Sequence, residues 1–337
     1  TYEICNRLTK KGYDVVVYFP FFPFLEEDRL FSLSGFKFFL RGIARSLVRR
    51  NKVLWFETHF KIKIIPLFKN LFVRDADIVI ANHWPVARPV FEFDPCKGKK
   101  YFFIRDIEQW APYYENEIKA FNLDMKRLVV AEWIKDFLSE NFNLGVDGVI
   151  TNGFNFKKFD IGDKEFPKDR CTISMIYSTL PVKAMDDGFK VLESVKKKNP
   201  SVKILLFGFE AKPKDAPFSF EYIRGAAGEE VRDIYKRTDI FFCPSHQEGF
   251  HNPPSEAMAG KCAVLATSVG SVPFTMNNMI NGLVSETKDI NDMINKMNML
   301  VENRELRIQL SMEANKTIKN LKWDDSIDKL INIFESQ

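Results

Sequence analysis

The segment Glu248-Gly-Phe-His-Asn-Pro-Pro-Ser-Glu256-Ala-Met-Ala-Gly260 places two carboxylates on either side of a Pro-Pro step. It follows the apolar run Asp239-Ile-Phe-Phe-Cys-Pro244, which is typical of a buried strand. Proline suits the first turn of a helix, where a missing N–H costs little, and glycine suits the residue just past the end. The spacing of Pro253, Pro254 and Gly260 therefore predicts a strand followed by a helix of about two turns.

Two kinds of polar group meet near the start of this predicted helix. Its free amides and the positive end of its dipole attract a phosphate group. The carboxylates of Glu248 and Glu256 can accept hydrogen bonds from sugar hydroxyls. Together these groups describe a site for a nucleotide-sugar. The simpler interpretation is that Glu248 is a turn residue and Glu256 an acid in the first helical turn.

Short apolar segments alternate with helical patterns along the chain, which is the signature of parallel sheets built from βαβ units. The strands expected in the first half are residues 14–18, 53–56, 77–81, 101–104, 128–131 and 148–151. Those in the second half are residues 172–177, 203–208, 220–223, 239–243, 262–266 and 282–284. Clear helical patterns cover residues 185–198, 228–237, 290–302 and 304–320. The given residues open inside a helix, so we expect a first strand and its Gly-rich loop to precede them.

A chain of 337 residues is too long for one typical core, so two domains are expected. The turn at Asn152-Gly153 and the charged stretch after it indicate the boundary. We therefore predict two Rossmann-like parallel-sheet domains facing a central cleft, because ligands of such sheets bind outside the carboxyl ends of the strands. The expected parts are an N-terminal acceptor-side domain over 1–155, a C-terminal donor domain over 156–320, and a helix over 321–337 that packs back toward the N-terminal domain.

The composition excludes several classes of protein. A net charge of +4 gives no indication of nucleic-acid binding, and no apolar run reaches the ~18 residues of a membrane span. The five cysteines are scattered without a CxxC pair, which argues against a disulfide framework and a zinc site and favours a reducing compartment. The four histidines have unrelated spacings, so they add no metal signature.

The segment from Glu248 to Gly260 closely resembles the E-x7-E motif of retaining family 4 glycosyltransferases, which have the GT-B fold. Other stretches resemble that family in the expected order, so the resemblance covers nearly the whole chain. They are Lys10-Lys-Gly-Tyr-Asp-Val-Val-Val, Ala76-Asp-Ile-Val-Ile-Ala-Asn-His83, Val149-Ile-Thr-Asn-Gly-Phe-Asn with Phe159, Leu205-Leu-Phe-Gly, Asp239-Ile-Phe-Phe-Cys-Pro-Ser and Trp323.

The resemblance implies a role for each matching position in the donor domain. Glu256 would hold the ribose hydroxyls, and Lys183 would bind the diphosphate. A fixed cation there lowers the barrier, because breaking the sugar–diphosphate bond puts negative charge on the leaving phosphate. The donor sugar would contact Glu248 and the loop of Gly249, Phe250, His251 and Asn252. The nucleotide base would be gripped by the loop that contains Tyr222 and Arg224.

Two further positions lie in the expected N-terminal domain. His83 matches the family's histidine that faces the sugar, so we count it with Glu248 and Lys183 as catalytic; the alternative is a structural histidine. Asp106, in Arg105-Asp106-Ile-Glu108, follows a predicted strand. It would contact an acceptor hydroxyl or belong to a structural ion pair.

The chain also departs from the family pattern. The arginine expected several residues before Lys183 is absent, since the run reads Ile176-Tyr-Ser-Thr-Leu-Pro181. The usual Lys-Gly step reads Lys183-Ala184. The later GG-x-pE pattern reads Gly270-Ser-Val-Pro-Phe274, without its acid.

The resemblance implies a retaining glycosyltransferase that moves a sugar from a nucleoside-diphosphate donor to a hydroxyl of a glycan or glycolipid, in cell-surface polysaccharide biosynthesis. UDP is the favoured nucleotide, with GDP and dTDP as alternatives. We expect no cofactor and no metal, because no D-x-D cluster suited to Mg²⁺ appears at the end of a predicted strand. The alternatives are a GT-B nucleotide-sugar epimerase and an inactive GT-B binding subunit.

One stretch of the chain is strongly basic. Nine Lys and Arg residues stand against one acid, Glu57, between Lys37 and Lys69. Lys37, Arg41, Arg45 and Arg49 recur every four residues and would form one stripe on a helix. The stripe would dock on an anionic membrane where a lipid-linked acceptor resides, or be plain solvated surface. We therefore expect a cytoplasmic protein, peripheral at the inner face of the plasma membrane.

Overall fold

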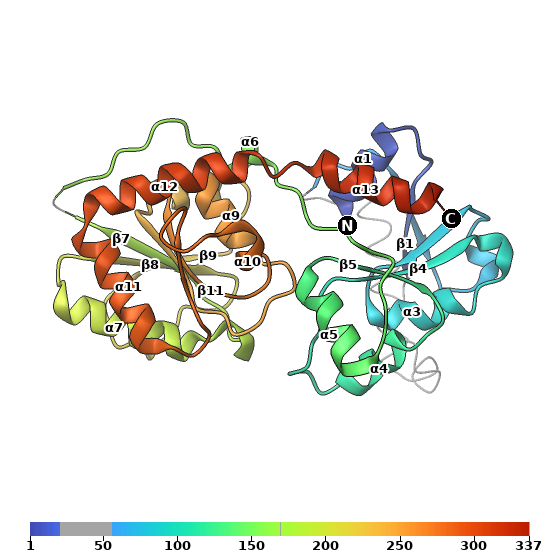
Figure 1. The fold of residues 1–337 in the computed structure, drawn as a ribbon, viewed down its shortest axis with the longest axis horizontal. Coiled ribbons are helices and arrows are strands. Elements are labelled where there is room, and N and C mark those ends of the chain that lie inside the picture. Colours follow the sequence, from blue (N-terminus) through green and yellow to red (C-terminus); the bar gives the residue numbers. More distant parts are fainter. Residues whose placement is uncertain (21–55, 169, 337) are drawn as a thin grey trace. The chain divides into compact units, whose positions relative to one another are not determined.

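The computed structural model describes residues 1–20, 56–168 and 170–336. The chain divides into two compact units (Figure 1): the first comprises Thr1–Thr151 and Trp323–Gln337, and the second Asn152–Lys322. The boundaries predicted from the sequence are 155/156 and 320/321. The final helix is therefore part of the first unit, although the second unit precedes it in the sequence.

The first unit is built on two parallel sheets. A two-stranded sheet pairs β1 (Val16–Pro20) with β2 (Lys61–Ile65). A four-stranded sheet has the order β3-β4-β5-β6, with β3 Ile78–Ala81, β4 Lys99–Ile104, β5 Lys126–Val129 and β6 Gly148–Val149. The helices are α1 Tyr2–Lys10, α3 Trp84–Phe91, α4 Tyr114–Phe121, α5 Glu132–Phe142 and α13 Trp323–Glu335, with short 3-10 turns at Asn70–Phe72 and Pro95–Lys97.

The last helix, α13, is joined to the first unit by charge and by packing. Arg7 of α1 and Lys11, the residue just after it, form ion pairs with Asp324 and Asp328 of α13, at 2.7 and 2.6 Å. On its apolar side, the ring of Phe334 lies 5.2 Å from the ring of the fully buried Tyr101 in β4. These contacts explain why the helix groups with residues more than 300 positions away in the sequence.

The second unit contains a six-stranded parallel sheet of order β12-β11-β10-β7-β8-β9. The strands are β7 Thr172–Ile176, β8 Lys203–Gly208, β9 Glu221–Arg224, β10 Ile240–Cys243, β11 Ala263–Thr267 and β12 Leu283–Ser285. The helices are α6 Phe156–Phe159, α7 Met185–Lys198, α8 Glu229–Arg237, α9 Asn252–Ala259, α10 Val272–Thr275, α11 Ile290–Glu302 and α12 Arg304–Lys319, with a 3-10 turn, η4, at Pro181–Lys183.

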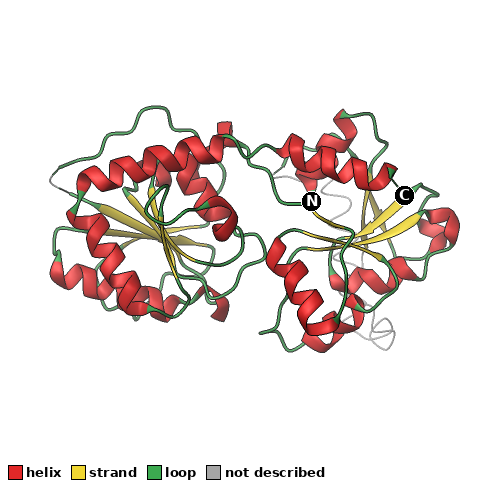
Figure 2. Ribbon diagram, viewed as in Figure 1, coloured by secondary structure: helices red, strands yellow, loops and turns green. Residues whose placement is uncertain are grey.

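Helices cover both faces of this sheet (Figure 2), so the central strand β10, Ile-Phe-Phe-Cys, is apolar and buried along its whole length. Alternate residues of β10 enter different cores: Phe241 packs with residues of α8, α9 and α12, and Phe242 with residues of α7 and α11. The strand order reverses at β7, which lies between β8 and β10. Loops after β7 and β10 therefore diverge at a topological switch point, the usual ligand position in such sheets.

The predicted fold class, two α/β domains with parallel sheets, is confirmed by the strand pairing. The sequence missed β2, because its exposed Lys61 and Lys63 were read as part of the basic stretch. Their alternation with Ile62 and Ile64 is nevertheless the period of a half-buried strand. Apart from Phe56, the predicted strand 53–56 lies outside the described residues, as does the basic stripe from Lys37 to Arg49. None of the described helices is long and apolar enough to cross a membrane.

Candidate functional site

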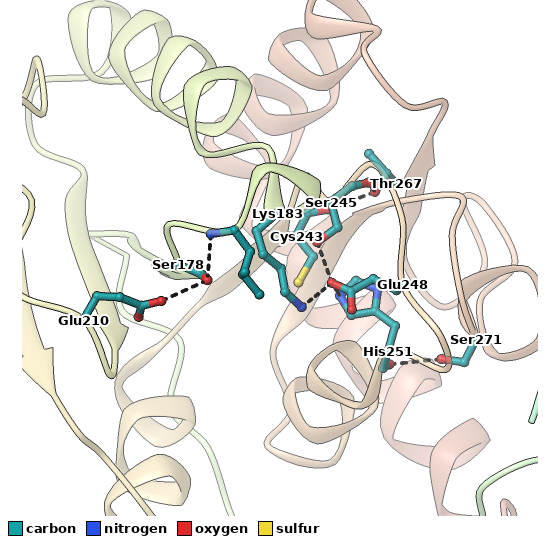
Figure 3. Close-up of polar contacts among 10 residues, drawn as sticks. Ser178, Lys183, Glu210, Cys243, Ser245, Glu248, His251, Thr267 and Ser271 are labelled. Carbon is teal, nitrogen blue, oxygen red and sulfur yellow. Dashed lines mark hydrogen bonds and ion pairs between the residues drawn. The ribbon is translucent and has the colours of Figure 1, made fainter. Parts of the chain in front are cut away.

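The predicted donor residues Lys183 and Glu248 meet beyond the carboxyl ends of β7 and β10 (Figure 3). Lys183 ends η4, and Glu248 lies in the loop that leads from β10 to α9. Between Lys183 and α7, Ala184 adopts a left-handed conformation with φ +52°. Glycine adopts this conformation without strain, which gives a physical reason for the usual Lys-Gly step at this position.

Three side chains lie around one carboxylate oxygen of Glu248. Its Oε1 accepts hydrogen bonds from Lys183 Nζ at 2.6 Å and from Ser245 Oγ at 2.7 Å. His251 Nε2 lies 3.6 Å from the same oxygen. Burial alone would raise the pKa of Glu248, but His251, Lys183 and the two hydrogen bonds together hold it below its usual value. The carboxylate therefore stays ionised and fixes the Lys183 ammonium in place.

His251 begins α9 in an unusual conformation. It has φ +70° and is 5% exposed. Burial lowers its pKa to about 4, so the ring is neutral at pH 7. Its Nδ1 has no hydrogen-bond partner among the described residues. A buried ring nitrogen without a partner at the mouth of a helix suits a ligand hydroxyl.

The loop that contains His251 is held from the side by Gly270 and Ser271. Ser271 Oγ donates to the backbone oxygen of His251 at 3.1 Å, and its amide donates to that of Phe250. Gly270 has φ +61°, and a Cβ there would lie 2.8 Å from His251 Cβ and 2.9 Å from Phe250 O. Backbone conformation and the close neighbours thus both require glycine at position 270, three residues after the end of β11.

Glu256 lies on the second turn of α9 and faces Tyr235 of α8. Its Oε2 accepts a hydrogen bond from the Tyr235 hydroxyl at 3.1 Å. Burial raises the pKa of Glu256, and the bond from Tyr235 opposes that rise. Among the described residues no side chain bonds to its second oxygen, and the residue is partly exposed. Glu256 can therefore accept hydrogen bonds from a ligand.

The predicted base-binding residues lie on β9, at the edge of the sheet. The Tyr222 hydroxyl donates to the backbone oxygen of Glu210 at 2.7 Å. Arg224 Nε donates to the backbone oxygen of Phe209 at 3.3 Å, and the Phe209 ring is 76% exposed. Both residues thus support the loop after β8 through its backbone, while Phe209 presents an apolar face to solvent.

Ser178 and Glu210, which the sequence did not single out, bond to each other in the loops after β7 and β8. They stand near the position of the missing arginine, and Ser178 Oγ donates to Glu210 Oε1 at 3.1 Å (Figure 3). The Thr179 amide donates to the same oxygen at 3.3 Å. The one signal for Glu210 in the sequence is its place, two residues after the end of β8. An acidic residue at such a place is common and does not by itself indicate a function.

The remaining predicted residues take separate positions. Asn252, the first residue of α9, is exposed and accepts a hydrogen bond from Asn152 at 3.4 Å. His83 and Asp106 belong to the first unit, where both line one pocket at the ends of β3 and β4. Burial lowers the pKa of His83, and Glu108 opposes that shift. No group of three or more metal-ligating side chains occurs in the part of the chain that the structure describes.

Residues 156–317, which make up most of the second unit, match the family described as "Glycosyl transferases group 1". The capsular polysaccharide biosynthesis glycosyltransferase CapM of Staphylococcus aureus is 22% identical over 261 residues, which cover 72% of this chain and 68% of that protein. Two further curated glycosyltransferase relatives are covered over 25% and 59% of their length.

Solved structures show the same fold. The sucrose-phosphate synthase of Thermosynechococcus elongatus superposes with a TM-score of 0.70 at 14% identity, over 99% of this chain and 91% of that one. TarM of S. aureus, determined with Fondaparinux, alpha-GlcNAc-glycerol and UDP, superposes with a TM-score of 0.64 at 22% identity. That match covers 77% of this chain and 56% of TarM. The chain therefore has the architecture of GT-B glycosyltransferases.

Proposed function

We propose that this chain is a retaining glycosyltransferase that transfers a sugar from a nucleoside-diphosphate donor to a hydroxyl of a glycan or lipid-linked acceptor. The observation that carries the proposal is the Lys183–Glu248 pair at the start of α9, in a unit that matches the group 1 glycosyltransferases. The capsular polysaccharide relative supports a role in cell-surface polysaccharide biosynthesis.

The donor fits the second unit through four kinds of contact. Lys183 and the positive end of the α9 dipole bind the diphosphate, because both offer positive charge. Of the first three residues of α9 only Asn252 has an amide N–H to donate, because the next two are prolines. Glu256 accepts hydrogen bonds from the ribose hydroxyls. Glu248 and the loop from Gly249 to Asn252 contact the sugar. Tyr222 and Arg224 support the loop after β8, against which the base binds.

The nucleotide is UDP in this proposal, since UDP is present in the TarM structure. A thermal-shift panel of UDP, GDP, dTDP and ADP tests that choice. A ligand at 100 times its dissociation constant adds about 2.7 kcal/mol to the stability of the protein, which such a panel resolves. The largest shift is expected with UDP, and a larger shift with GDP or dTDP would change the nucleotide.

Catalysis proceeds without a metal ion or other cofactor in this proposal, because Lys183 and the end of α9 take up the charge of the departing diphosphate. Glu248 is engaged by Lys183 and Ser245, so it positions the donor rather than attacking the sugar. The leaving phosphate takes the acceptor's proton on the same face, which retains the anomeric configuration. The resemblance gives His83 the role of the family's histidine that faces the sugar. Turnover in EDTA, with the product's anomeric configuration read by NMR, tests both points.

A second function, a binding subunit without turnover, is favoured by one observation. Ser178 and Glu210 stand near the position of the expected arginine, so the diphosphate meets one cation fewer. Product analysis separates the functions: a transferase needs donor and acceptor, an epimerase converts the donor alone, and a binding subunit does neither. Tight UDP binding without turnover would favour the subunit.

The enzyme acts in the cytoplasm at the inner membrane surface in this proposal, with the basic residues Lys37, Arg41, Arg45 and Arg49 facing anionic lipids. The structure does not describe these residues. Sedimentation with anionic and neutral vesicles tests the proposal, because the screening length falls from about 10 Å at 0.1 M salt to about 3 Å at 1 M. Binding only to anionic vesicles at low salt, lost when Arg41, Arg45 and Arg49 become Glu, is expected. Binding that the triple variant retains would contradict it.

A further inference from the structure

The carboxyl ends of β3 and β4 border a small pocket within the first unit, with a volume of about 60 Å³. Its polar lining comes from three elements: His83 and Trp84 at the start of α3, Arg105, Asp106 and Glu108 after β4, and Glu117 of α4. We call this the first-unit pocket. Every residue that lines it lies between positions 82 and 117, so the first unit alone forms this pocket.

Two buried polar atoms of the first-unit pocket lack a partner among the described residues: Trp84 Nε1 and Glu108 Oε2. The indole N–H can only donate a hydrogen bond, and an ionised carboxylate oxygen can only accept one. Buried polar atoms are almost always paired, so two opposite unpaired atoms in one pocket require an explanation.

Both side chains are held in place by their neighbours. The Trp84 ring packs against Tyr113, with ring centroids 5.3 Å apart. The Glu108 carboxylate bonds to the Tyr113 hydroxyl, an interaction that helps raise the pKa of Tyr113 to about 12, and the backbone N–H of Glu108 donates to Glu117 Oε2 at 2.8 Å. Neither group therefore turns away freely to find another partner, and the two atoms form a donor–acceptor pair in the lining of one pocket.

The chemistry of the pair selects the ligand. A hydroxyl group donates to Glu108 Oε2 while its oxygen accepts from Trp84 Nε1, so it satisfies both atoms. An ammonium group cannot accept the indole bond. An ionised phosphate or carboxylate has no hydrogen to donate to Glu108. Asp106 and Glu108 repel such an anion, against the attraction of Arg105 in the same lining.

The size of the pocket narrows the choice further. A water molecule's share of liquid volume is about 30 Å³, so the pocket takes one hydroxyl group with its carbon rather than a whole sugar ring. Burial and the nearby Glu108 and Asp106 outweigh the backbone bond from Glu108 and raise the pKa of Glu117 to about 7. Part of the Glu117 population is therefore protonated at neutral pH, which suits a neutral ligand.

We infer that the first-unit pocket binds one hydroxyl-bearing carbon of a neutral polyol or sugar, held between Trp84 Nε1 and Glu108 Oε2. Assigning this group to the acceptor rests on the proposed function. The binding itself does not, since the pocket's own atoms define it. If the group belongs to the acceptor, Glu108 and Trp84 orient it and set the preference for a free hydroxyl.

The indole N–H of Trp84 gives a direct test by NMR. We would titrate the full chain with glycerol and, separately, with methyl α-D-glucopyranoside, and follow the tryptophan indole signals, with Trp84 identified through Trp84→Phe. The expected result is a saturable shift of the Trp84 signal while those of Trp133 and Trp323 stay in place. Glu108→Gln should weaken the binding about tenfold, because the acceptor loses its charge. Glu92→Gln, an exposed acid at the end of α3, is the matched control.

Two results would overturn the inference. One is a Trp84 signal that no probe shifts, which would mean that the pocket holds water alone. The other is equal affinity of Glu108→Gln and the parent chain. UDP binding, measured by calorimetry on the same samples, is expected to be unchanged by Glu108→Gln. If the parent chain does not bind UDP, that result counts against the proposed function. It does not affect the conclusion on the first-unit pocket.

Discussion

The ammonium of Lys183 lies 2.6 Å from Glu248 Oε1, although 65 residues separate the two in the sequence. The contact forms because β7 and β10 are neighbours in the sheet, so the loops that follow them start side by side. Glu248 is 12% exposed at its side chain and Lys183 28% exposed, so the cation remains accessible to a ligand from the open side. A diphosphate that binds at α9 would share this cation with Glu248.

Lys183→Ala is expected to lower kcat by about 10²–10³, because it removes a fixed charge that stabilises the leaving diphosphate. Ser245 still bonds to Glu248, so the loop should keep its fold by circular dichroism. Lys190→Ala, a well-exposed lysine on α7, is the control and should retain full turnover. Activity of Lys183→Ala within twofold of the parent would remove this residue from the phosphate site.

Glu256→Ala is expected to weaken UDP binding by roughly tenfold or more, since hydrogen bonds from ribose hydroxyls to a carboxylate are lost. Tyr235→Phe is the matched control, because it removes the Tyr235–Glu256 hydrogen bond and keeps the carboxylate. Calorimetry should show a smaller loss for Tyr235→Phe. Unchanged affinity in a folded Glu256→Ala protein would refute the ribose assignment.

The buried His251 predicts a pH dependence of stability. Its pKa is about 4 in the folded state and 6.5 in the reference state, so below pH 6.5 the unfolded chain takes up a proton that the native chain does not. Stability is therefore lost as pH falls from 6.5 to about 4, by about 3 kcal/mol for this group. His251→Asn, which tolerates the left-handed backbone, should show a smaller loss over the same range.

The five tryptophans, Trp55, Trp84, Trp110, Trp133 and Trp323, all belong to the first unit. Urea unfolding followed by circular dichroism therefore reports both units, and tryptophan fluorescence reports the first. The unfolding transition that circular dichroism shows and fluorescence does not belongs to the second unit. The stabilities of His251→Asn and the parent are compared on that transition. Parallel losses of stability in the two proteins would mean that His251 titrates normally in the native state.

Gly270→Ala is expected to destabilise the second unit by more than Gly225→Ala. Both glycines have positive φ, +61° and +73°, so both changes introduce a backbone strain of about 1–2 kcal/mol. Only at Gly270 does the new Cβ also meet His251 and Phe250, whereas nothing lies within 4 Å at Gly225. Urea unfolding should therefore show a larger loss of unfolding free energy for Gly270→Ala than for Gly225→Ala. Equal losses would show that the loop of His251 and Phe250 moves aside for the new Cβ without strain.

Ala184→Gly is expected to stabilise the second unit by about 0.5–1 kcal/mol. The change relieves a left-handed alanine at φ +52°, and the greater freedom of glycine in the unfolded chain offsets part of the gain. Turnover should be retained, because Lys183 keeps its neighbours. If Ala184→Gly unfolds at a lower urea concentration than the parent, the inference that Ala184 is strained would be wrong.

Much of the fold could be predicted from the sequence because apolar segments mark buried parallel strands directly. β8, for instance, has the expected bounds, and α7 and α11 begin and end where their periodicity does. β2 was missed because its charged alternation resembles a surface segment. Strand order is a tertiary property, so no local pattern indicated that β7 lies between β8 and β10.

The sequence predicts the local part of the candidate site and misses the contacts that depend on tertiary structure. Glu248, Glu256 and α9 lie in one continuous segment, so their relation followed from spacing. Ser178 and Glu210 bond across two loops that only the β7–β8 pairing brings together, so they were not predicted. The pairing of Glu256 with Tyr235 likewise depends on α8 packing beside α9.

The division of the chain also sets an order of synthesis. Residues 152–322 leave the ribosome as one uninterrupted piece, so the second unit can fold as soon as they have emerged. The first unit waits for α13, whose Ile333 side chain fills the place where a Cβ of Gly148 would lie and whose Phe334 packs against Tyr101. The first unit is thus begun before the second unit and completed after it. Until α13 is synthesised, the face of β4 and β6 that this helix covers is exposed and accessible to chaperones.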